Sequence, residues 1–432
     1  MKGLSIFQIT LLAVFAAIAV AAVLIFAFAV GGSTSASTGP VKIWGTLDAT
    51  AFNTVIRQAV ESDTRLSQVI YVQKEEKTFI TEVTDALASG QGPDLILLRQ
   101  DYAYSQAGKL IPIPYAKLSQ TQFANTFVES ANTFLSENGV LAIPLAVDPL
   151  VLYWNRDMLS TAGFSKPPQY WDELYVMART MTKRSDNGAI TKSAIAFGEY
   201  VNVDNAKDIL SLLILQAGGA ITARDNSGRV VPALSPKTGD LTQATPSALR
   251  FYTEFADPSK DDYTWNRSLA DARQAFATGD LAMYVGYASE QPLILRMNPN
   301  LNFAAAPIPQ RRGAPRATDV GHTYGFATPR TSGNPSGAIT VAYVLASTDT
   351  SKNLSTALGI PSARRDVLAQ PAQGEDELFN KLAIITRAWI DPDPAKTDDI
   401  FRGMIEDTTS GASLLSEAVT RAEQQLEHIL GL

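Results

Sequence analysis

Short apolar runs alternate with amphipathic stretches between residues 41 and 98. The apolar runs have the length and flanking turns of buried strands, and the stretches between them repeat their apolar positions at the spacing of a helix face. The run LILL at Leu95–Leu98 is typical of a strand buried on both faces of a parallel sheet. The predicted elements are strands at 41–44, 69–72 and 95–98 and helices at 51–62 and 79–87.

The order strand, helix, strand, helix, strand predicts a largely parallel α/β sheet. Ligands of such sheets bind in the crevice beyond the carboxyl ends of the strands. Arg99, Asp101 and Tyr102 directly follow the third strand, and residues 45–48 follow the first. We therefore predict a ligand cleft at these strand ends. The alternative is that Arg99 and Asp101 form a solvated pair on the surface.

A longer apolar region from Gly139 to Phe164 is interrupted at Asp148 and Pro149. Proline in sheets is confined to edges, bends and strand starts. The interruption therefore predicts a strand that passes from one lobe of the protein into another. Later patterns predict a helix at 204–217, a strand at 281–286 followed by Tyr287, a helix at 375–389 and a final amphipathic helix at 414–429.

Residues 4–30 form an apolar run without a charged residue. A helix of this run is roughly 40 Å long and covers a hydrocarbon core of about 30 Å. A signal that is removed usually has an apolar region of only about 7–15 residues. We therefore predict a transmembrane anchor, with cleavage near residues 35–37 as the alternative. Lys2 precedes the run, which favours a cytoplasmic N-terminus and an exported body. Residues 31–40 are predicted to be a flexible linker.

Composition restricts the class of protein. A chain of 432 residues is too long for one ordinary core, so two lobes are expected. The net charge of −7 argues against a nucleic-acid partner. Cysteine is absent and only His322 and His428 could supply imidazole, which excludes disulfides, a thiolate nucleophile and a histidine-rich metal centre. No phosphate-binding loop or nucleophile elbow occurs. We predict no catalytic residue, no metal and no cofactor.

Four ordered segments resemble the extracellular solute-binding proteins of ABC importers, in the group that includes maltose-binding protein. They span most of residues 41–358. The segments read ALASGQGPDLILL, GVLAIPLAVDPLVLYWNRDML, QAFATGDLAMYVGYASE and AAAPIPQRRG followed by GFATPRTSGNPSGAITVAYVLAS.

The resemblance implies the periplasmic-binding-protein-like fold, an α/β fold of two lobes joined by crossing strands, with the ligand held between the lobes. Placed on this sequence, it implies crossings near Asp148, near residues 307–309 and around residues 358–361. The expected bounds are 4–30 for the anchor, 31–40 for the linker, 41–147 and 308–357 for lobe 1, and 148–307 and 358–432 for lobe 2.

The resemblance also implies which residues contact the ligand. Tyrosine and tryptophan offer flat apolar faces to a sugar ring, carboxylates accept its hydroxyl protons, and arginine presents a fork of donors. The same Arg99 and carboxylates could instead bind an amino acid or another zwitterion. This second ligand class therefore stays open. The candidate ligand-binding residues are Trp44, Thr46, Asp48, Arg99, Asp101, Tyr102, Asp148, Glu199, Tyr200, Tyr287, Tyr324 and Trp389.

The implied function is that of a monomeric receptor, anchored in the cell membrane with its body outside, which binds a small molecule and delivers it to the transmembrane subunits of an ABC permease. A sugar or oligosaccharide is favoured by the resemblance. Two alternatives stay open: a sensor module for an amino acid or other polar solute, and a membrane-anchored carbohydrate-active enzyme.

Overall fold

The structure is a computed structural model that describes residues 38–235 and 243–432. The predicted anchor at residues 4–30 and most of the predicted linker lie outside the described residues. Among those residues, no helix combines the length and the apolar character needed to cross a membrane. Thr38, near the end of the predicted linker, is held on the body of the protein, because the side-chain amide of Asn334 donates to its carbonyl oxygen over 2.6 Å.

The strands are β1 (Val41–Gly45), β2 (Val69–Gln73), β3 (Leu95–Arg99), β4 (Leu135–Ser136), β5 (Gly139–Val140), β6 (Ile143–Asn155), β7 (Lys183–Arg184), β8 (Ile190–Ile195), β9 (Thr222–Arg224), β10 (Val230–Pro232), β11 (Leu281–Tyr287), β12 (Phe303–Ala306), β13 (Asp319–Ala327) and β14 (Thr386–Arg387). The helices are α2 (Ala49–Val60), α3 (Phe79–Ala88), α4 (Ala103–Gln106), α5 (Gln120–Thr126), α6 (Arg156–Thr161), α7 (Leu174–Met181), α8 (Ala206–Gln216), α9 (Ala244–Glu254), α10 (Ala272–Ala277), α11 (Gln291–Met297), α12 (Pro335–Leu345), α13 (Thr348–Leu358), α14 (Arg365–Leu368), α15 (Gly374–Ile385), α16 (Pro394–Thr409) and α17 (Leu415–Leu430).

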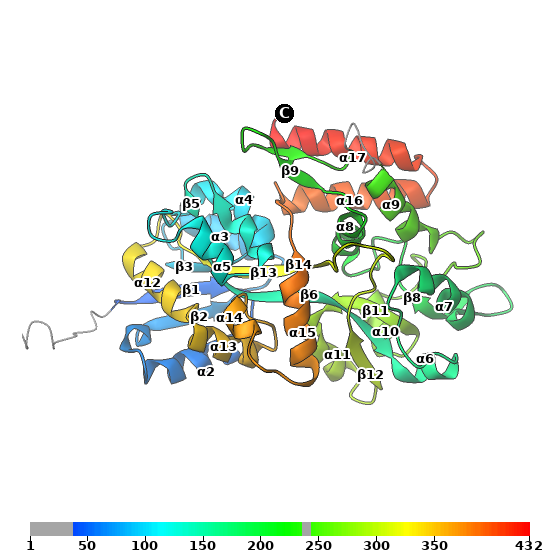
Figure 1. Ribbon diagram of the computed structural model, residues 1–432, viewed down its shortest axis with the longest axis horizontal. Coiled ribbons are helices and arrows are strands. Elements are labelled where there is room, and N and C mark those ends of the chain that lie inside the picture. The colour runs from blue at the N-terminus through cyan, green and yellow to red at the C-terminus, as the bar shows by residue number, and fades with distance from the viewer. Residues whose placement is uncertain (1–37, 236–242) are drawn as a thin grey trace, which may run out of the picture.

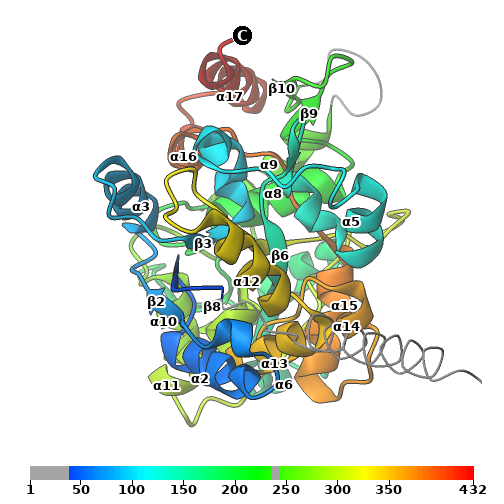
Figure 2. The same ribbon diagram turned by 90° about the vertical axis from the view of Figure 1, so that its left-hand side faces the viewer.

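One sheet extends through both halves of the molecule in the strand order β2-β1-β3-β13-β6-β11-β8-β7, with β12 beside β6 and β14 beside β13. β1 is parallel to both β2 and β3, which confirms the parallel order predicted for the first three strands. Figure 1 shows α2, α12 and α13 gathered at one end of the sheet and α6, α7 and α10 at the other. Figure 2, turned by 90°, brings the end with α2, α12 and α13 to the front.

Two separate hydrophobic cores define two lobes. The first core consists of buried side chains from Val41 to Val147 and from Tyr324 to Ala383. The second runs from Leu150 to Val320 and continues in α16 and α17. The family resemblance therefore implied the correct fold class, an α/β protein of two lobes.

Strand β6 passes from the first core into the second without a break in burial. Its first half pairs with β13, where Pro149 lies opposite Gly321 and Asp148 opposite His322. Its second half pairs with β11 and β12. β13 connects the lobes beside it, because it also pairs with β3 of the first lobe. Pro149 lies at the point where β6 changes partners, which explains why proline is tolerated inside a buried strand.

Helix α15 makes a third connection. Leu382 packs in the second core, whereas Ala383 packs in the first. The chain before α15 stays with lobe 1, since Ile360 and Ala363 pack in the first core and Ala363 N–H donates to the Leu145 carbonyl over 2.9 Å. The expected bounds placed these residues in lobe 2.

Helix α15 is shorter than the helix predicted at 375–389. It ends at Ile385 because Thr386 and Arg387 form β14, which pairs with the first residues of β13. That long-range pairing satisfies backbone groups that a longer helix would have paired internally. Trp389 is consequently outside the helix.

Candidate functional site

A cleft of about 990 Å³ opens between the two lobes, above the crossing strands. Both lobes and both crossing strands contribute to it. Its lining residues are Glu76, Arg99, Asp101, Tyr102, Asp148, Tyr200, Val201, Val203, Asp204, Asn205, Ala206, Lys207, Asp208, Arg273, Tyr287, Ser289, Glu290, His322, Tyr324, Pro394, Ala395, Asp398, Asp399 and Arg402.

The wall formed by lobe 1 is the segment that follows β3. Arg99 forms a fork with Asp101, in which Nε donates to Oδ1 over 2.9 Å and Nη2 donates to Oδ2 over 2.7 Å. Its remaining nitrogen, Nη1, donates to Glu76 Oε1 over 2.6 Å. Burial raises the pKa of Asp101, but Arg99 outweighs this effect and the pKa lies below its usual value. Tyr102 lies beside the guanidinium, with its ring centroid 5.3 Å from Cζ.

Gln100 explains why this segment is held so close to the crossing strands. Its side chain is buried between β3 and β13. The amide oxygen accepts from Thr323 N–H over 2.6 Å, and the amide nitrogen donates to the Gly321 carbonyl over 3.3 Å. The segment that carries Arg99 and Asp101 is therefore tied to the strand that carries His322 and Tyr324.

The floor of the cleft is formed by β6 and β13. Asp148 is only 2% exposed, and its Oδ1 accepts from Ser289 N–H over 3.0 Å. Burial raises the pKa of Asp148 to about 7; hydrogen bonding from Ser289 opposes the rise, and the nearby charges of Glu290 and Glu76 add to it. Asp148 is the most deeply buried carboxylate among the lining residues.

The wall formed by lobe 2 is the end of β11. Tyr287 is positioned by its backbone, because the hydroxyl of Tyr153 donates to its carbonyl over 2.8 Å and its N–H donates to Glu290 Oε1 over 2.9 Å. Glu290 also accepts from the Tyr284 hydroxyl over 2.6 Å and from Arg273 over 3.1 Å. This network makes the β11 end a rigid platform for the Tyr287 ring.

Tyr287 bridges lobe 2 to the crossing strand β13. Its ring stacks on His322 with centroids 4.2 Å apart, and its hydroxyl lies 3.0 Å from His322 Nε2. Burial lowers the pKa of His322 well below its ordinary value, and Arg99 adds to the effect, so the imidazole is neutral.

Helices α8 and α16 complete the lobe 2 wall. Lys207 donates to Asp391 Oδ2 over 2.8 Å and to Thr397 Oγ1 over 2.7 Å. Tyr200 donates its hydroxyl hydrogen bond to Asp398, and the guanidinium of Arg402 lies over the Tyr200 ring. The cleft is therefore rich in tyrosine rings and in charged groups that are already paired.

Seven of the twelve predicted ligand-binding residues line this one cleft: Arg99, Asp101, Tyr102, Asp148, Tyr200, Tyr287 and Tyr324. They come from both lobes and from both crossing strands. Arg99 and Asp101 are thus not a solvated pair on the surface. Contact of these side chains with a ligand stays a prediction.

Five predicted residues lie outside the cleft lining, namely Trp44, Thr46, Asp48, Glu199 and Trp389. Asp48 caps helix α2 by accepting from Ala51 N–H over 2.7 Å. Lys74 covers the Trp44 ring, and the carbonyl of Thr46 accepts from Gln73.

The other two make contacts within lobe 2. Glu199 pairs with Arg267 over 3.1 Å, and Trp389 stacks on Phe401 with ring centroids 6.0 Å apart. Trp389 is nevertheless close to the cleft, because Lys207 lies 5.4 Å from its ring centroid.

Several ionisable lining residues were not predicted: Glu76, Asp204, Lys207, Asp208, Arg273, Glu290, His322, Asp398, Asp399 and Arg402. The sequence contains features that could have identified Glu290 and His322 as candidate site residues. Glu290 follows the end of a predicted strand, as Tyr287 does, and His322 is one of only two histidines. The residues of α8 and α16 carried no such signal, because polar residues on helices are common on any surface.

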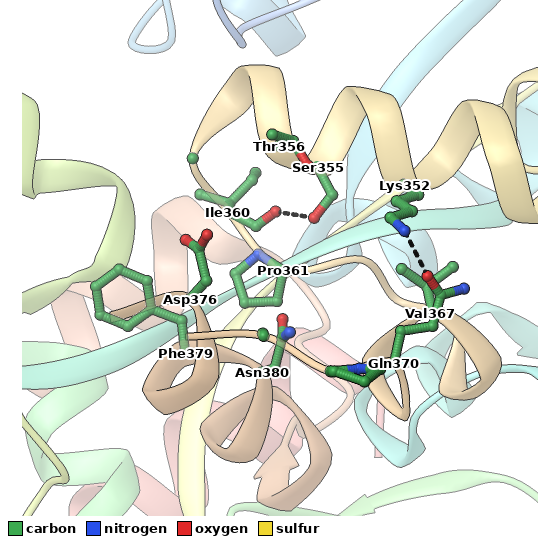
Figure 3. A pocket seen from close by; sticks show the side chains of 13 residues that line it. Lys352, Ser355, Thr356, Ile360, Pro361, Val367, Gln370, Asp376, Phe379 and Asn380 are labelled. Atoms are coloured by element: carbon green, nitrogen blue, oxygen red, sulfur yellow. Dashed lines mark hydrogen bonds between the residues drawn. The ribbon is translucent and has the colours of Figure 1, made fainter. Parts of the chain in front are cut away.

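A second cavity, of about 150 Å³, lies between α13, α14 and α15 (Figure 3). Two hydrogen bonds organise its rim: Ser355 Oγ donates to the Ile360 carbonyl over 2.5 Å, and Lys352 Nζ donates to Gln370 Oε1 over 2.6 Å. None of the predicted ligand-binding residues lines it. Its small volume and its position away from the strand ends make the inter-lobe cleft the better candidate site.

Comparison with known proteins identifies a family and several similar proteins. The family model described as bacterial extracellular solute-binding protein matches residues 57–381. A binding protein of Brucella abortus is 26% identical over 99 residues, which are 22% of this chain and 23% of that protein. The chain therefore aligns with about a quarter of the length of that relative.

Solved structures share the fold over nearly the full chain. A solute-binding protein of an ABC transporter from Thermotoga lettingae, bound with alpha-D-tagatose, has 22% identity and a TM-score of 0.68, with 91% of this chain and 100% of that chain covered. The GacH receptor of Streptomyces glaucescens, solved with acarbose, has 18% identity, a TM-score of 0.70 and coverage of 91% and 98%. The cyclic alpha-maltosyl-1,6-maltose binding protein of Arthrobacter globiformis has 16% identity, a TM-score of 0.73 and coverage of 91% and 99%.

Proposed function

Because the chain belongs to the bacterial extracellular solute-binding proteins, a family of binding proteins and not of enzymes, we propose that it is a receptor that binds a sugar or oligosaccharide and delivers it to an ABC permease. The observation that carries the proposal is the cleft between the lobes, where four tyrosine rings and a set of hydrogen-bonding groups converge from both sides.

The tyrosines suit a polyhydroxylated ligand. Tyr102, Tyr200, Tyr287 and Tyr324 all line the cleft. An aromatic face covers the C–H groups of a sugar ring, while carboxylates, amides and hydroxyls satisfy the ring of hydroxyl groups around its edge. Concave sites with apolar walls and a few convergent polar groups are the general form of small-molecule sites.

The ligands named for similar structures support the same class. The protein of Thermotoga lettingae was solved with a monosaccharide, tagatose, and the receptor of Streptomyces glaucescens with acarbose. A cleft of about 990 Å³ has room for a ligand of more than one sugar unit.

The arrangement of the lobes supports a mechanism in which binding closes the cleft. A ligand that contacts Tyr102 of lobe 1 and Tyr287 of lobe 2 interacts with both only when the lobes approach. Its differential affinity then shifts the population toward the closed form. The crossing strands β6 and β13 are the connections about which the lobes turn. No bond is made or broken.

We propose in addition that residues 4–30 anchor the receptor in the cell membrane, with the body outside. The support is the uncharged apolar run in the sequence. In membrane fractions of expressing cells, the full chain should be released by detergent but not by high salt or carbonate, whereas a variant lacking residues 1–37 should be recovered in the soluble fraction. Recovery of the full chain without detergent contradicts the anchor.

A ligand screen tests the receptor proposal. Residues 38–432 are screened by thermal shift against mono- and oligosaccharides, amino acids and polyamines, and hits are measured by calorimetry. A ligand present at a hundred times its Kd stabilises the folded protein by about 2.7 kcal/mol, so a specific sugar should raise Tm. Small-angle X-ray scattering should show a smaller radius of gyration with that sugar. A response to amino acids alone contradicts the proposal.

A further inference from the structure

We infer that the ligand of the cleft is a cationic sugar, one that carries an ammonium group, because, among the described residues that line the cleft, some carboxylates have no ion pair whereas every lysine and arginine has one. The inference rests on the proposed sugar-receptor function and specifies its substrate class. Among the lining residues, eight carry carboxylates and four carry permanent positive charges.

Every lysine and arginine among the lining residues already has a carboxylate partner. Arg99 has two, Asp101 at 2.7 Å and Glu76 at 2.6 Å. Lys207 is paired with Asp391, which is 2% exposed, over 2.8 Å. These groups have their donors directed at protein oxygens.

The remaining two bases are paired in the same way. Arg273 contacts Glu290 over 3.1 Å and Asp204 over 3.2 Å. Arg402 contacts both Asp398 over 3.2 Å and Asp399 over 3.1 Å. An anionic ligand would therefore have to break one of these ion pairs before it could bind a positively charged side chain. Breaking the pair leaves its carboxylate without a partner, which costs free energy.

Two carboxylates of the cleft have no ion pair among the described residues: Asp148 and Asp208. Asp148 accepts one backbone hydrogen bond through Oδ1, from Ser289 N–H. Both carboxylates line the cleft together with Tyr287. Burial raises the pKa of Asp208, and Lys207 and the Tyr287 hydroxyl oppose the rise.

Burial of a carboxylate without a partner costs free energy, and a positively charged group in the cleft would recover it. The Tyr287 ring, which lines the same cleft as the two carboxylates, provides an apolar face for a sugar ring, and an aromatic face also attracts an ammonium group. An ammonium substituent on that sugar would then lie within reach of a carboxylate. The same reasoning disfavours ligands that carry a carboxylate of their own, such as uronic acids and amino acids. Arg99 is not available to bind the carboxylate of such a ligand.

Matched sugars test the inference. Calorimetry is performed on residues 38–432 with three matched sets of monosaccharides. The amino sugars are glucosamine, galactosamine and mannosamine, their neutral counterparts are glucose, galactose and mannose, and the acidic counterparts are the corresponding uronic acids. Trisaccharides of glucosamine and of glucose form a further matched pair. In the best-binding pair, the amino sugar should bind about tenfold more tightly than its neutral counterpart, and the uronic acid should not bind. The advantage should shrink as sodium chloride is raised.

The inference is overturned when a neutral sugar or a uronic acid binds as tightly as its amino counterpart, and in that case the proposed sugar receptor still stands. Binding of lysine or spermidine with no response to any sugar overturns both. The two failures are therefore distinguishable.

Variants locate the effect. Asp148→Asn and Asp208→Asn should each lower the ratio of amino-sugar affinity to neutral-sugar affinity by about tenfold, because the amide keeps the shape of the side chain but loses its negative charge. Asp186→Asn, at an exposed position outside the cleft, should change neither. Circular dichroism confirms that each variant is folded. A full preference for the amino sugar in both cleft variants contradicts the inference.

Discussion

Arg99 and Asp101 form a two-bond fork, with Nε to Oδ1 at 2.9 Å and Nη2 to Oδ2 at 2.7 Å. The side chains are only 19% and 15% exposed. The fork lies directly after β3, at the edge of the cleft, where it holds the segment that carries Tyr102. A pair of this geometry gives the wall of a binding site a fixed shape, because both side chains are held in one rotamer.

Replacement of Arg99 by Lys should destabilise the protein. Lysine keeps the charge but loses the planar fork, so Asp101 or Glu76 is left with fewer donors. We expect a loss of about 1–3 kcal/mol in the free energy of unfolding, measured by urea denaturation. Arg250→Lys, at an exposed position without an ion pair among the described residues, is the control and should be neutral. Equal stability of the two variants contradicts a structural role of the fork.

Removal of Tyr287 or Asp148 should weaken ligand binding. Tyr287→Ala removes the ring that faces the cleft from lobe 2, and Asp148→Ala removes the carboxylate of the floor. We expect each variant to lose about 1–3 kcal/mol of binding free energy in calorimetry with the ligand found by the screen. Tyr343→Ala, at a tyrosine 39% exposed on α12, is the control. Unchanged affinity in both cleft variants would refute this site.

Stability without ligand should depend on pH through Asp148. Its pKa is raised from 3.8 to about 7 in the folded protein, so the folded state holds a proton that the unfolded state has released. The resulting stabilisation is complete below about pH 4 and is lost as the pH rises through about 7. Asp391, with a pKa raised to about 6, acts in the same direction.

The variant Asp148→Asn separates this contribution from the others. Its free energy of unfolding should decline less between pH 5 and pH 8 than that of the unmodified protein, and it should be the more stable of the two at pH 8. Urea denaturation at several pH values measures both. Parallel pH profiles of the two proteins would show that Asp148 does not hold the proton.

Gly321 permits the close contact between the crossing strands. A Cβ at this position would lie 2.5 Å from the Asp148 carbonyl oxygen and 2.8 Å from Pro149 Cα. Gly321→Ala should therefore separate β13 from β6, destabilise the protein by about 1–3 kcal/mol and weaken ligand binding by moving Asp148. Gly403→Ala is the matched control: nothing lies within 4 Å of its Cβ. In the middle of α16, alanine should stabilise by about 0.5–1 kcal/mol. A neutral Gly321→Ala variant contradicts the close contact.

Much of the fold was determined by the sequence alone. The apolar runs at 41–44, 69–72 and 95–98 became β1, β2 and β3, because short continuous apolar runs between turns have few other ways to be buried. The break at Asp148 and Pro149 marked the point where β6 changes partners. Arg99 and Tyr287 were found because a polar or aromatic residue after a buried strand lies at the sheet edge where ligands bind.

Only the tertiary structure determines which charged side chains lie close enough to form pairs. Lys207 and Asp391 are 184 residues apart and pair over 2.8 Å, and Asp148 lies opposite His322 only through the register of β6 and β13. Trp44 lies near the end of β1 and Glu199 follows β8, yet both have partners outside the cleft, Lys74 and Arg267. Local patterns report which face of an element is buried, whereas pairing between distant elements depends on strand register and helix packing. That Asp148 and Asp208 have no ion pair among the described residues therefore becomes visible only in the folded protein.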